Sequence, residues 1–387
     1  MRRCSLFALV LLLVAGCASA APAPAPTPPQ PADQALAATV TPTRGSPTLT
    51  PAPTVRPTLT PAPTRTPAPT VPPTDTQRVP AAPEVSLAVV GDLMLARSIG
   101  ERISSGDPAA PLAAVSAELA AADLTIGNLE CAIGLDGTPA PKAYRFLAPP
   151  AATATLTSAG FDLVSLANNH ILDWGDEALA GTAASLDAAG IAHVGAGANA
   201  AAARAPAVIE RNGLRLAFLG YVDVPVERGG FVTESWTAGA DTPGVAWADP
   251  ELIAADVRAI HPQVDHVIIL LHSGYEGQDT PNEVQHAAAE AALEAGATLV
   301  LGAHPHVLQG TEARDGRLIA WSLGNFVFDG FADTPSVDSA ILHITLDKQG
   351  VSAFRWSPVR LIDGYPQPLD PAGEGAAILE NLARLSR

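Results

Sequence analysis

Gly302-Ala303-His304-Pro305-His306-Val307 follows the apolar run Leu299–Leu301, and His272-Ser273-Gly274-Tyr275-Glu276 follows the apolar pair Leu270-Leu271 about thirty residues earlier. Short apolar runs that stop at glycine or at polar residues are typical of buried strands. In open α/β sheets, ligands bind beyond the carboxyl ends of parallel strands. The two segments therefore predict two strand ends that carry histidines toward one site.

His272, His304 and His306 are the side chains that these segments offer to a metal ion. In an extended segment, residues two apart point to the same face, so His304 and His306 converge. Pro305 fixes one φ angle between them and stiffens the pair. Because neutral imidazole is the commonest protein ligand for zinc-like ions, we predict that the three histidines bind metal. A purely structural role is the alternative.

Other polar residues fall at the ends of apolar runs in the same way. The runs end at Gly91-Asp92, lead to Asn128 and Glu130, or end at Asn168-Asn169-His170. Unrelated surface residues would not fall repeatedly at strand ends, so we expect these side chains to lie with the histidines along one sheet edge. An N-cap or turn role is the alternative for Asp92, Asn128 and Glu130.

His170 and Asp173 are three residues apart, and Asp173 is placed to accept a hydrogen bond that fixes the tautomer of His170. A satisfied buried histidine is the alternative. Glu276 and Asn325 are further candidates to line the pocket, although Asn325 and Asp329 also suit a role in turns.

The chain from Val85 onward alternates strand and helix patterns, which predicts an α/β fold. Asn212-Gly213 between two apolar runs predicts a hairpin. Expected helices are Leu112–Ala121, Thr153–Ala159, Asp176–Ala189, Glu251–Ile260 and Asn282–Ala295, and the tail is expected to form antiparallel strands at Leu318–Leu323, Ser339–Leu346 and Val351–Pro358.

Residues 1–17 resemble a bacterial lipoprotein signal peptide, with Arg2-Arg3, an apolar run from Leu6 to Val14, and Val14-Ala15-Gly16-Cys17 as the lipobox. We expect Cys17 to be acylated and to hold the protein on the membrane, outside the cytoplasm. An ordinary signal peptide cut near Ala18-Ser19-Ala20 is the alternative. Removal of Cys4 and acylation of Cys17 leave Cys131 without a disulfide partner.

Residues 18–83 are rich in Pro, Ala and Thr and contain about half of the 37 prolines. The octapeptide Pro47–Thr54 recurs at Pro57–Thr64. Such a composition cannot bury a core and favours extended polyproline II, so we expect a disordered linker that spaces the domain from the membrane.

Residues 84–387 are long enough for one domain with a large core. Residues 1–83 contain six of the 22 basic and two of the 39 acidic residues, so the domain has 16 basic and 37 acidic residues, a net charge of −21. This charge argues against nucleic acid as a partner. An anionic substrate stays possible because a bound dication inverts the local field.

Six blocks of this domain resemble the bacterial CapA family of poly-γ-glutamate capsule biosynthesis proteins. The blocks are Gly91–Arg97, Gly127–Glu130, Ala167–His170 with Asp173 and Gly175, His272–Glu276, Gly302–Gln309 and Ser322–Asp329, and Lys142–Phe146 also looks like a family segment. The resemblance implies the metallophosphoesterase fold, a β-sandwich flanked by helices that holds up to two metal ions.

The resemblance also implies roles for individual residues. Asp92, Asn169, His272, His304 and His306 match ligand positions, and His170 matches the residue that protonates a leaving group or binds phosphate. The mixed ligands suit one or two Mn, Zn or Fe ions per chain. Two positions depart from the pattern, because Met94 replaces a ligand histidine and Asn128 replaces the bridging carboxylate, with Glu130 as a possible substitute.

The resemblance finally implies a role in the synthesis of capsule, poly-γ-glutamate or another cell-envelope polymer. One expectation is a metal-dependent hydrolase that acts on such a polymer or on a phosphoester. The alternative is a non-catalytic protein with a degraded metal site that binds an envelope polymer or a capsule synthase.

Overall fold

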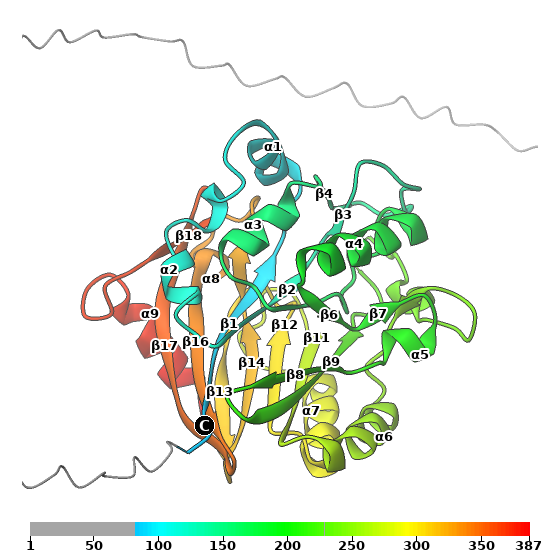
Figure 1. The fold of residues 1–387 in the computed structure, drawn as a ribbon. Coiled ribbons are helices and arrows are strands. Elements are labelled where there is room, and N and C mark those ends of the chain that lie inside the picture. Colours follow the sequence, from blue (N-terminus) through cyan, green and yellow to red (C-terminus); the bar gives the residue numbers. More distant parts are fainter. Residues whose placement is uncertain (1–81, 228) are drawn as a thin grey trace, which may run out of the picture. The chain divides into compact units, whose positions relative to one another are not determined.

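The computed structural model describes residues 82–227 and 229–387 (Figure 1). The predicted signal peptide 1–17 with Cys17, and the predicted linker 18–83 as far as residue 81, lie outside the described residues. Within the described part of the chain, none of the helices has both the length and the apolar character that a membrane span requires.

The first sheet is mixed, with a parallel centre and antiparallel strands on one side. Its order is β18 (Tyr365–Pro368), β17 (Gly350–Ile362), β16 (Asp338–Asp347), β1 (Val85–Leu93), β2 (Leu124–Leu129), β5 (Leu163–Ser165) and β6 (Ala192–Val194), and β15 (Asn325–Val327) pairs with the end of β1.

The second sheet has four parallel strands with an antiparallel strand at each edge. Its order is β13 (Leu308–Arg314), β14 (Arg317–Leu323), β12 (Leu299–Ala303), β11 (His266–Ser273), β9 (Leu214–Asp223) and β8 (Ala207–Arg211). Two small pairs complete the strands, β7 (Ala196–Gly197) with β10 (Gly244–Val245), and β3 (Ala132–Ile133) with β4 (Leu147–Ala148).

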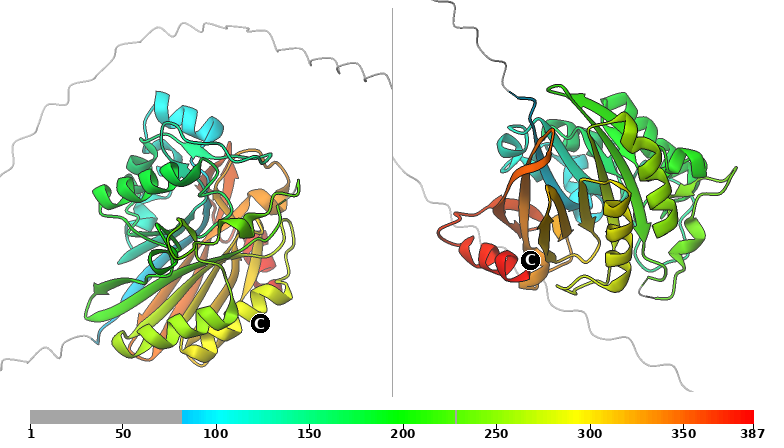
Figure 2. Two further views of the ribbon diagram at one scale, coloured as in Figure 1. Left: turned by 90° about the vertical axis from the view of Figure 1, so that its right-hand side faces the viewer. Right: turned by 90° about the horizontal axis from the view of Figure 1, so that it is seen from below.

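The two sheets pack face to face because their strands alternate between two hydrophobic clusters. In β11, Ile268 and Leu270 face the first sheet, whereas Val267 and Ile269 pack on helices. This period of two is the signature of a strand buried on both faces. The observed layers are helix, sheet, sheet and helix (Figure 2), which confirms the predicted α/β sandwich flanked by helices.

Helices cover the outer face of each sheet. The first sheet is covered by α1 (Arg97–Ser105), α2 (Ser116–Leu119), α3 (Ala152–Ser158) and α4 (Gly175–Ala189), and the second by α6 (Pro250–Ile260) and α7 (Glu283–Ala295). The remaining helical segments are α5 (Ala200–Ala203), α8 (Thr334–Val337), α9 (Ala376–Leu385), and the 3-10 turns η1 (Ala110–Leu112), η2 (Thr233–Trp236) and η3 (His261–Gln263).

Local sequence sets the helix ends. Asn282 and Gln285 form a capping box at the start of α7, and Gly296 ends the helix in the left-handed region with φ +116°. Asp249 accepts from the backbone at the start of α6, where Pro250 occupies the first helical position. Gly190 closes α4 as predicted.

Three sequence expectations are wrong. The expected helix at Leu112–Ala121 is only η1 and the single turn α2. In the tail, β16 and β17 pair antiparallel as expected, but β14 pairs in parallel with β12 as well as antiparallel with β13 in the second sheet, so the tail is not antiparallel throughout. The polar strand ends also belong to two sheets rather than to one sheet edge, because apolar periodicity reports burial and does not report which strands pair.

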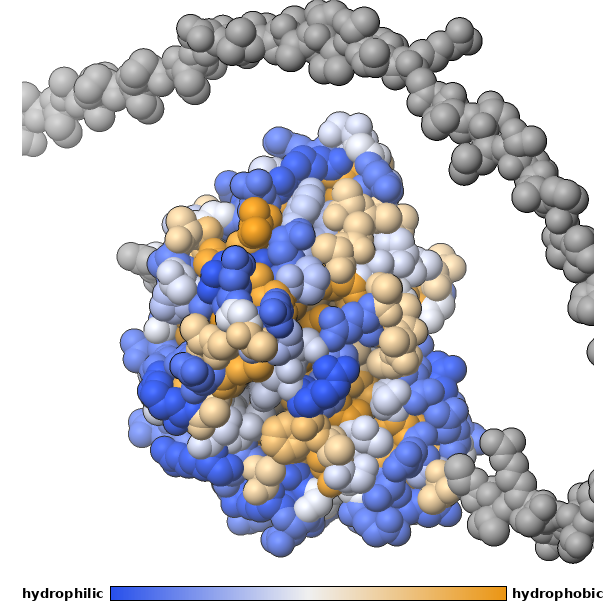
Figure 3. Space-filling view, turned by 90° about the vertical axis from the view of Figure 1, so that its left-hand side faces the viewer, coloured by the Kyte–Doolittle hydropathy of each residue, from blue (hydrophilic) through white to orange (hydrophobic). Residues whose placement is uncertain are grey.

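β17 lies near the edge of the first sheet, separated by β16 from β1, whose end carries Asp92, and α9 packs on the same side. Figure 3 shows this face as a mixture of hydrophilic and hydrophobic residues. Two large apolar side chains of β17, Phe354 and Ile362, are exposed. Scattered apolar residues of this kind are normal on a protein surface.

Candidate metal centre

The carboxyl ends of β1, β2 and β5 in the first sheet meet those of β11 and β12 in the second. Asp92 joins this cluster because of a bulge in β1. Two residues of β1, Val90 and Gly91, oppose one residue of β2 between Val89 and Asp92, so the extra residue returns Asp92 to the inner face. Gly91 is required there, since a Cβ atom would lie 1.8 Å from the carbonyl oxygen of Gly324.

Carboxamides connect the two sheets at the cluster. Asn128 Nδ2 donates to Asp92 Oδ1 at 2.8 Å and lies 3.1 Å from His272 Nδ1. Asn169 Oδ1 lies 2.9 Å from His272 Nε2. Asn168, which belongs to the predicted polar group Asn168-Asn169-His170, holds Asn128 in place by donating to its Oδ1 at 3.2 Å.

Glu130 is the least satisfied group of the cluster. Its side chain is fully buried, and neither carboxylate oxygen has a hydrogen-bond partner among the described residues. Oε1 lies 3.9 Å from the Nε2 atoms of His170 and His272 and 3.8 Å from that of His306. Burial, reinforced by the nearby carboxylate of Asp92, raises the pKa of Glu130 well above its usual value.

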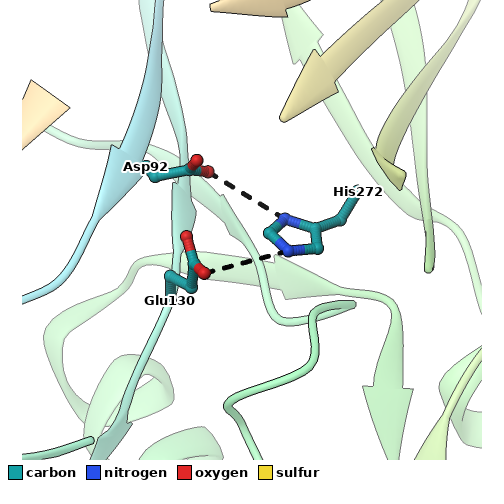
Figure 4. Close-up of side chains that lie close together, drawn as sticks. All are labelled: Asp92, Glu130 and His272. Atoms are coloured by element: carbon teal, nitrogen blue, oxygen red, sulfur yellow. Dashed lines mark ion pairs between the residues drawn. The ribbon is translucent and has the colours of Figure 1, made fainter. Parts of the chain in front are cut away.

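Asp92, Glu130 and His272 each direct one ligand atom into the same space (Figure 4). His272 Nδ1 lies 3.9 Å from Asp92 Oδ1, and this pair joins the two sheets. Burial lowers the pKa of His272 and of His304 well below the usual histidine value. Both rings are therefore neutral, which is the form that binds metal ions.

The turn after β12 places His304 and His306 in unusual backbone conformations. Both have positive φ angles, +96° and +58°, which cost free energy in residues other than glycine. Nδ1 of His304 is buried without a hydrogen-bond partner in the described chain, whereas Nδ1 of His306 lies 2.9 Å from Asn325 Oδ1. The backbone N–H of His304 donates to Asp92 Oδ2 at 3.3 Å.

These residues fit a divalent metal ion. Two atoms bound to one zinc-like ion lie at most about 4.3 Å apart, and the distances from Glu130 Oε1 to Nε2 of His272 and of His306 fall within that limit. An ion would also provide the charge that two buried, unpaired carboxylate oxygens lack. Every residue predicted to bind metal lies in or beside this cluster: Asp92, Asn128, Glu130, Asn169, His272, His304 and His306.

His170 lies at the rim of the cluster with Asp173. Its Nδ1 is 2.7 Å from Asp173 Oδ2, which is the contact predicted from the sequence. Burial raises the pKa of Asp173 to about 7 and lowers that of His170 well below its usual value. Phe146 stacks on the His170 ring with 4.0 Å between ring centroids and donates its N–H to Asp173.

Lys142 is a buried cation behind this pair, and its sequence context predicts no role for it beyond membership of a family segment. Its Nζ lies 2.7 Å from Asp173 Oδ1 and donates to the carbonyl oxygen of Asn169 at 2.6 Å. It also pairs with Glu227, which reaches Asn169 Nδ2 at 3.2 Å from the segment after β9. Contacts between residues 27 to 85 positions apart leave no local signal in a sequence.

A pocket of about 250 Å³ opens beside the cluster and shares His170 and His306 with it. Glu276 lines this pocket, as predicted, whereas Asn325 lies behind His306 and holds its ring. Asp329, considered for the site or a turn, pairs with Arg97 in the pocket wall.

Met94 does not offer a ligand in the structure. It lies in the core under the helices of the first sheet, and its sulfur accepts from the Ala96 N–H at 3.3 Å. Asn128 also supplies no charge to the cluster. The carboxylates that remain are Asp92 and Glu130, which favours one strong metal site over two equal sites.

The fold and the cluster together define an α/β sandwich with a candidate metal centre at the ends of its strands. Residues 86–330 match the family model of the bacterial capsule synthesis protein PGA_cap. The chain therefore belongs to this family, which confirms the resemblance found in the sequence.

Two relatives and one solved structure illustrate the similarity. The chain is 30% identical over 289 residues to the PGA biosynthesis protein CapA of Bacillus subtilis (strain 168), covering 74% of each chain. It is 29% identical over 310 residues to the capsule biosynthesis protein CapA of Bacillus anthracis, covering 78% of this chain and 73% of the relative. A phosphatase from Mycoplasma pneumoniae aligns with 75% of this chain and 99% of its own, with 13% identity and a TM-score of 0.44.

Proposed function

We propose that the chain is a metal-dependent hydrolase of capsule synthesis that acts on an envelope polymer or on a phosphoester. The observation that carries the proposal is the buried, unpaired carboxylate of Glu130 facing three imidazole Nε2 atoms. Two relatives are named for PGA biosynthesis and capsule biosynthesis, and these names support the choice of polymer.

The chain's own residues divide the work of hydrolysis. Glu130, Asp92, His272, His304 and His306 would hold the ion, which when bound lowers the pKa of a water ligand from 15.7 to about 7. His170 is held by Asp173 at Nδ1 and turns Nε2 toward the cluster. Because the pKa of Asp173 is about 7, the pair can store a proton near neutral pH and deliver it to a leaving group.

The test compares metal content and turnover in the purified full chain and two variants. His304→Ala should lose both metal and hydrolysis of a phosphoester panel, whereas His170→Asn should keep metal and lose turnover by about 10²-fold or more. Turnover that survives in His304→Ala would refute the hydrolase.

A second candidate function is a non-catalytic protein that binds an envelope polymer or a capsule synthase. The buried Met94 and the uncharged Asn128 favour it, because neither residue supplies the metal ligand that a two-metal hydrolase uses at that position. Partner capture that persists in His304→Ala, in a preparation without hydrolysis, would select this function.

The location is also part of the proposal. We infer that Cys17 is acylated and that residues 18–83 space the domain from the outer face of the cytoplasmic membrane, on the strength of the lipobox and the proline-rich composition. The intact chain should partition into detergent, and Cys17→Ser should not. Equal partitioning of the two chains would reject the lipid anchor.

A further inference from the structure

The pocket beside the histidine cluster contains one cation among its lining residues. Arg97, Tyr144, Phe146, His170, Glu276 and His306 are among those residues. We propose that Arg97 binds an anionic group of the substrate, a carboxylate or a phosphate, in this pocket. The inference deepens the proposed function, on which its link to substrate rests, because it names the chemical class that the pocket takes.

The guanidinium of Arg97 is held on one side and open on the other. Nη2 donates to the carbonyl oxygen of Asp329 at 2.5 Å and also pairs with the Asp329 carboxylate. Nε is buried without a hydrogen-bond partner among the described residues, and the side chain lines the pocket and stays 33% exposed. The planar fork therefore keeps donors for an oxyanion while Asp329 fixes its direction.

Aromatic rings set the position of this fork relative to the histidine cluster. The guanidinium carbon lies 4.8 Å from the Phe146 ring centroid and 5.7 Å from that of Phe328. Phe146 stacks on His170, and Phe328 meets His306 edge-on with 5.0 Å between centroids. One aromatic ring therefore lies between the Arg97 guanidinium and each of two histidines of the site.

The backbone at Arg97 supports a functional role. Arg97 begins α1 with a φ angle of +52°, a left-handed conformation that an arginine rarely adopts. Strain of this kind persists where surrounding contacts over-determine a residue, and it clusters at ligand sites. Here the Asp329 pair and the two rings hold the side chain at the pocket.

Charge explains why such a cation is needed. The domain has a net charge of −21, and Glu276 and Asp329 also line the pocket. An anionic substrate is repelled by this field unless a local cation offsets it. Asp329 already neutralises part of Arg97, so the affinity of the site for anions should increase when Asp329 loses its charge.

The experiment measures the affinity of the full chain for inorganic phosphate and for glutarate by calorimetry, with and without prior treatment with a chelator. Arg97→Gln should weaken binding by about tenfold or more, as expected for the loss of charged hydrogen bonds. Arg97→Lys should keep part of the affinity, since it retains the charge without the fork. Asp329→Asn should strengthen binding by about two- to fivefold, an increase that a misfolded variant cannot produce.

Arg314→Gln is the matched control, because Arg314 pairs with Glu290 on the surface away from the pocket. An Arg97-dependent loss for phosphate alone, or for glutarate alone, supports the site and identifies the anion. Equal losses in Arg97→Gln and Arg314→Gln, or no binding by the unaltered chain, overturn the inference. Arg97-dependent anion binding in a chain that takes up no metal when metal is added would refute only the hydrolase. Metal binding with unchanged anion affinity in Arg97→Gln would refute only the anion site.

Discussion

The two ends of β11 each carry a buried histidine, and the two are buried for different reasons. At the start of the strand, His266 has both ring nitrogens satisfied, with Nδ1 3.1 Å from Thr298 Oγ1 and Nε2 2.6 Å from the carbonyl oxygen of Asp347. At the end of the strand, His272 faces a carboxylate without any hydrogen-bond partner in the described chain, Glu130.

The difference shows that burial alone does not mark a metal site. Burial lowers the pKa of both histidines, so both rings are neutral. A buried polar group is normally paired, and the exceptions require an explanation. Of the two ends of β11, the His272 end lies beside unpaired buried groups, because both carboxylate oxygens of Glu130 and Nδ1 of His304 lack hydrogen-bond partners among the described residues. An ion explains both.

The first prediction replaces each of the two histidines of β11 by alanine. His272→Ala should lower the affinity for a divalent metal by more than about 100-fold, since even partners of ligands contribute 10- to 100-fold. His266→Ala should keep the metal and lower the free energy of unfolding by about 1–3 kcal/mol through its lost hydrogen bonds. Elemental analysis and thermal unfolding with added metal measure the two effects. Metal loss in both variants would show that the two ends of β11 do not differ.

The site residues were more predictable from the sequence than the strand pairing that brings them together. Each ligand candidate follows an apolar run, so a strand end was predictable for Asp92, Asn169 and His272. The division into two sheets was not predictable, because pairing between distant strands leaves no periodic signal. Glu130 is predicted from the sequence to lie with the histidines, with a turn role as the alternative. Its distances to residues of β11 and of the turn after β12 show that it is central to the cluster.

The sequence analysis did not predict the ion pairs around the site, for a related reason. Lys142 pairs with Asp173, 31 positions along the chain, and Arg97 pairs with Asp329, 232 positions along the chain. In the sequence, the members of either pair cannot be told from ordinary charged surface residues. Gly91 is similar, since only the approach of Gly324 explains why a glycine precedes Asp92.

A second prediction changes the charge at the His272 end of the strand. Without metal, Glu130→Gln should stabilise the protein by about 1–3 kcal/mol at neutral pH, because it removes a buried carboxyl group that must either stay charged without a partner or take up a proton. With metal, the same variant should be less stable than the unaltered chain, since a ligand is lost. Thermal unfolding with and without chelator should therefore show effects of opposite sign.

The pH dependence of this effect has a definite direction. The pKa of Glu130 is raised above its usual value of 4.5 in the folded chain, so its contribution to stability is fully present below that pH and is lost as pH rises. The metal-free unaltered chain should therefore lose stability relative to Glu130→Gln as pH rises above 4.5. A stability difference that is independent of pH would contradict the buried, ionisable carboxylate.

The smallest expected effect concerns Asp223, which pairs in register with Ser273 beside the end of β11 but lies outside the cluster. Burial and the repulsion of Glu234 raise the pKa of Asp223 to about 6. Its stabilising contribution is therefore present below about pH 4 and is lost as pH rises through about 6. Asp223→Asn should remove this loss, by less than about 1 kcal/mol because the group is partly exposed to solvent. The gain should be the same with and without chelator, since Asp223 holds no metal, whereas a gain that disappears with metal would place Asp223 in the metal centre and extend the site one strand beyond β11.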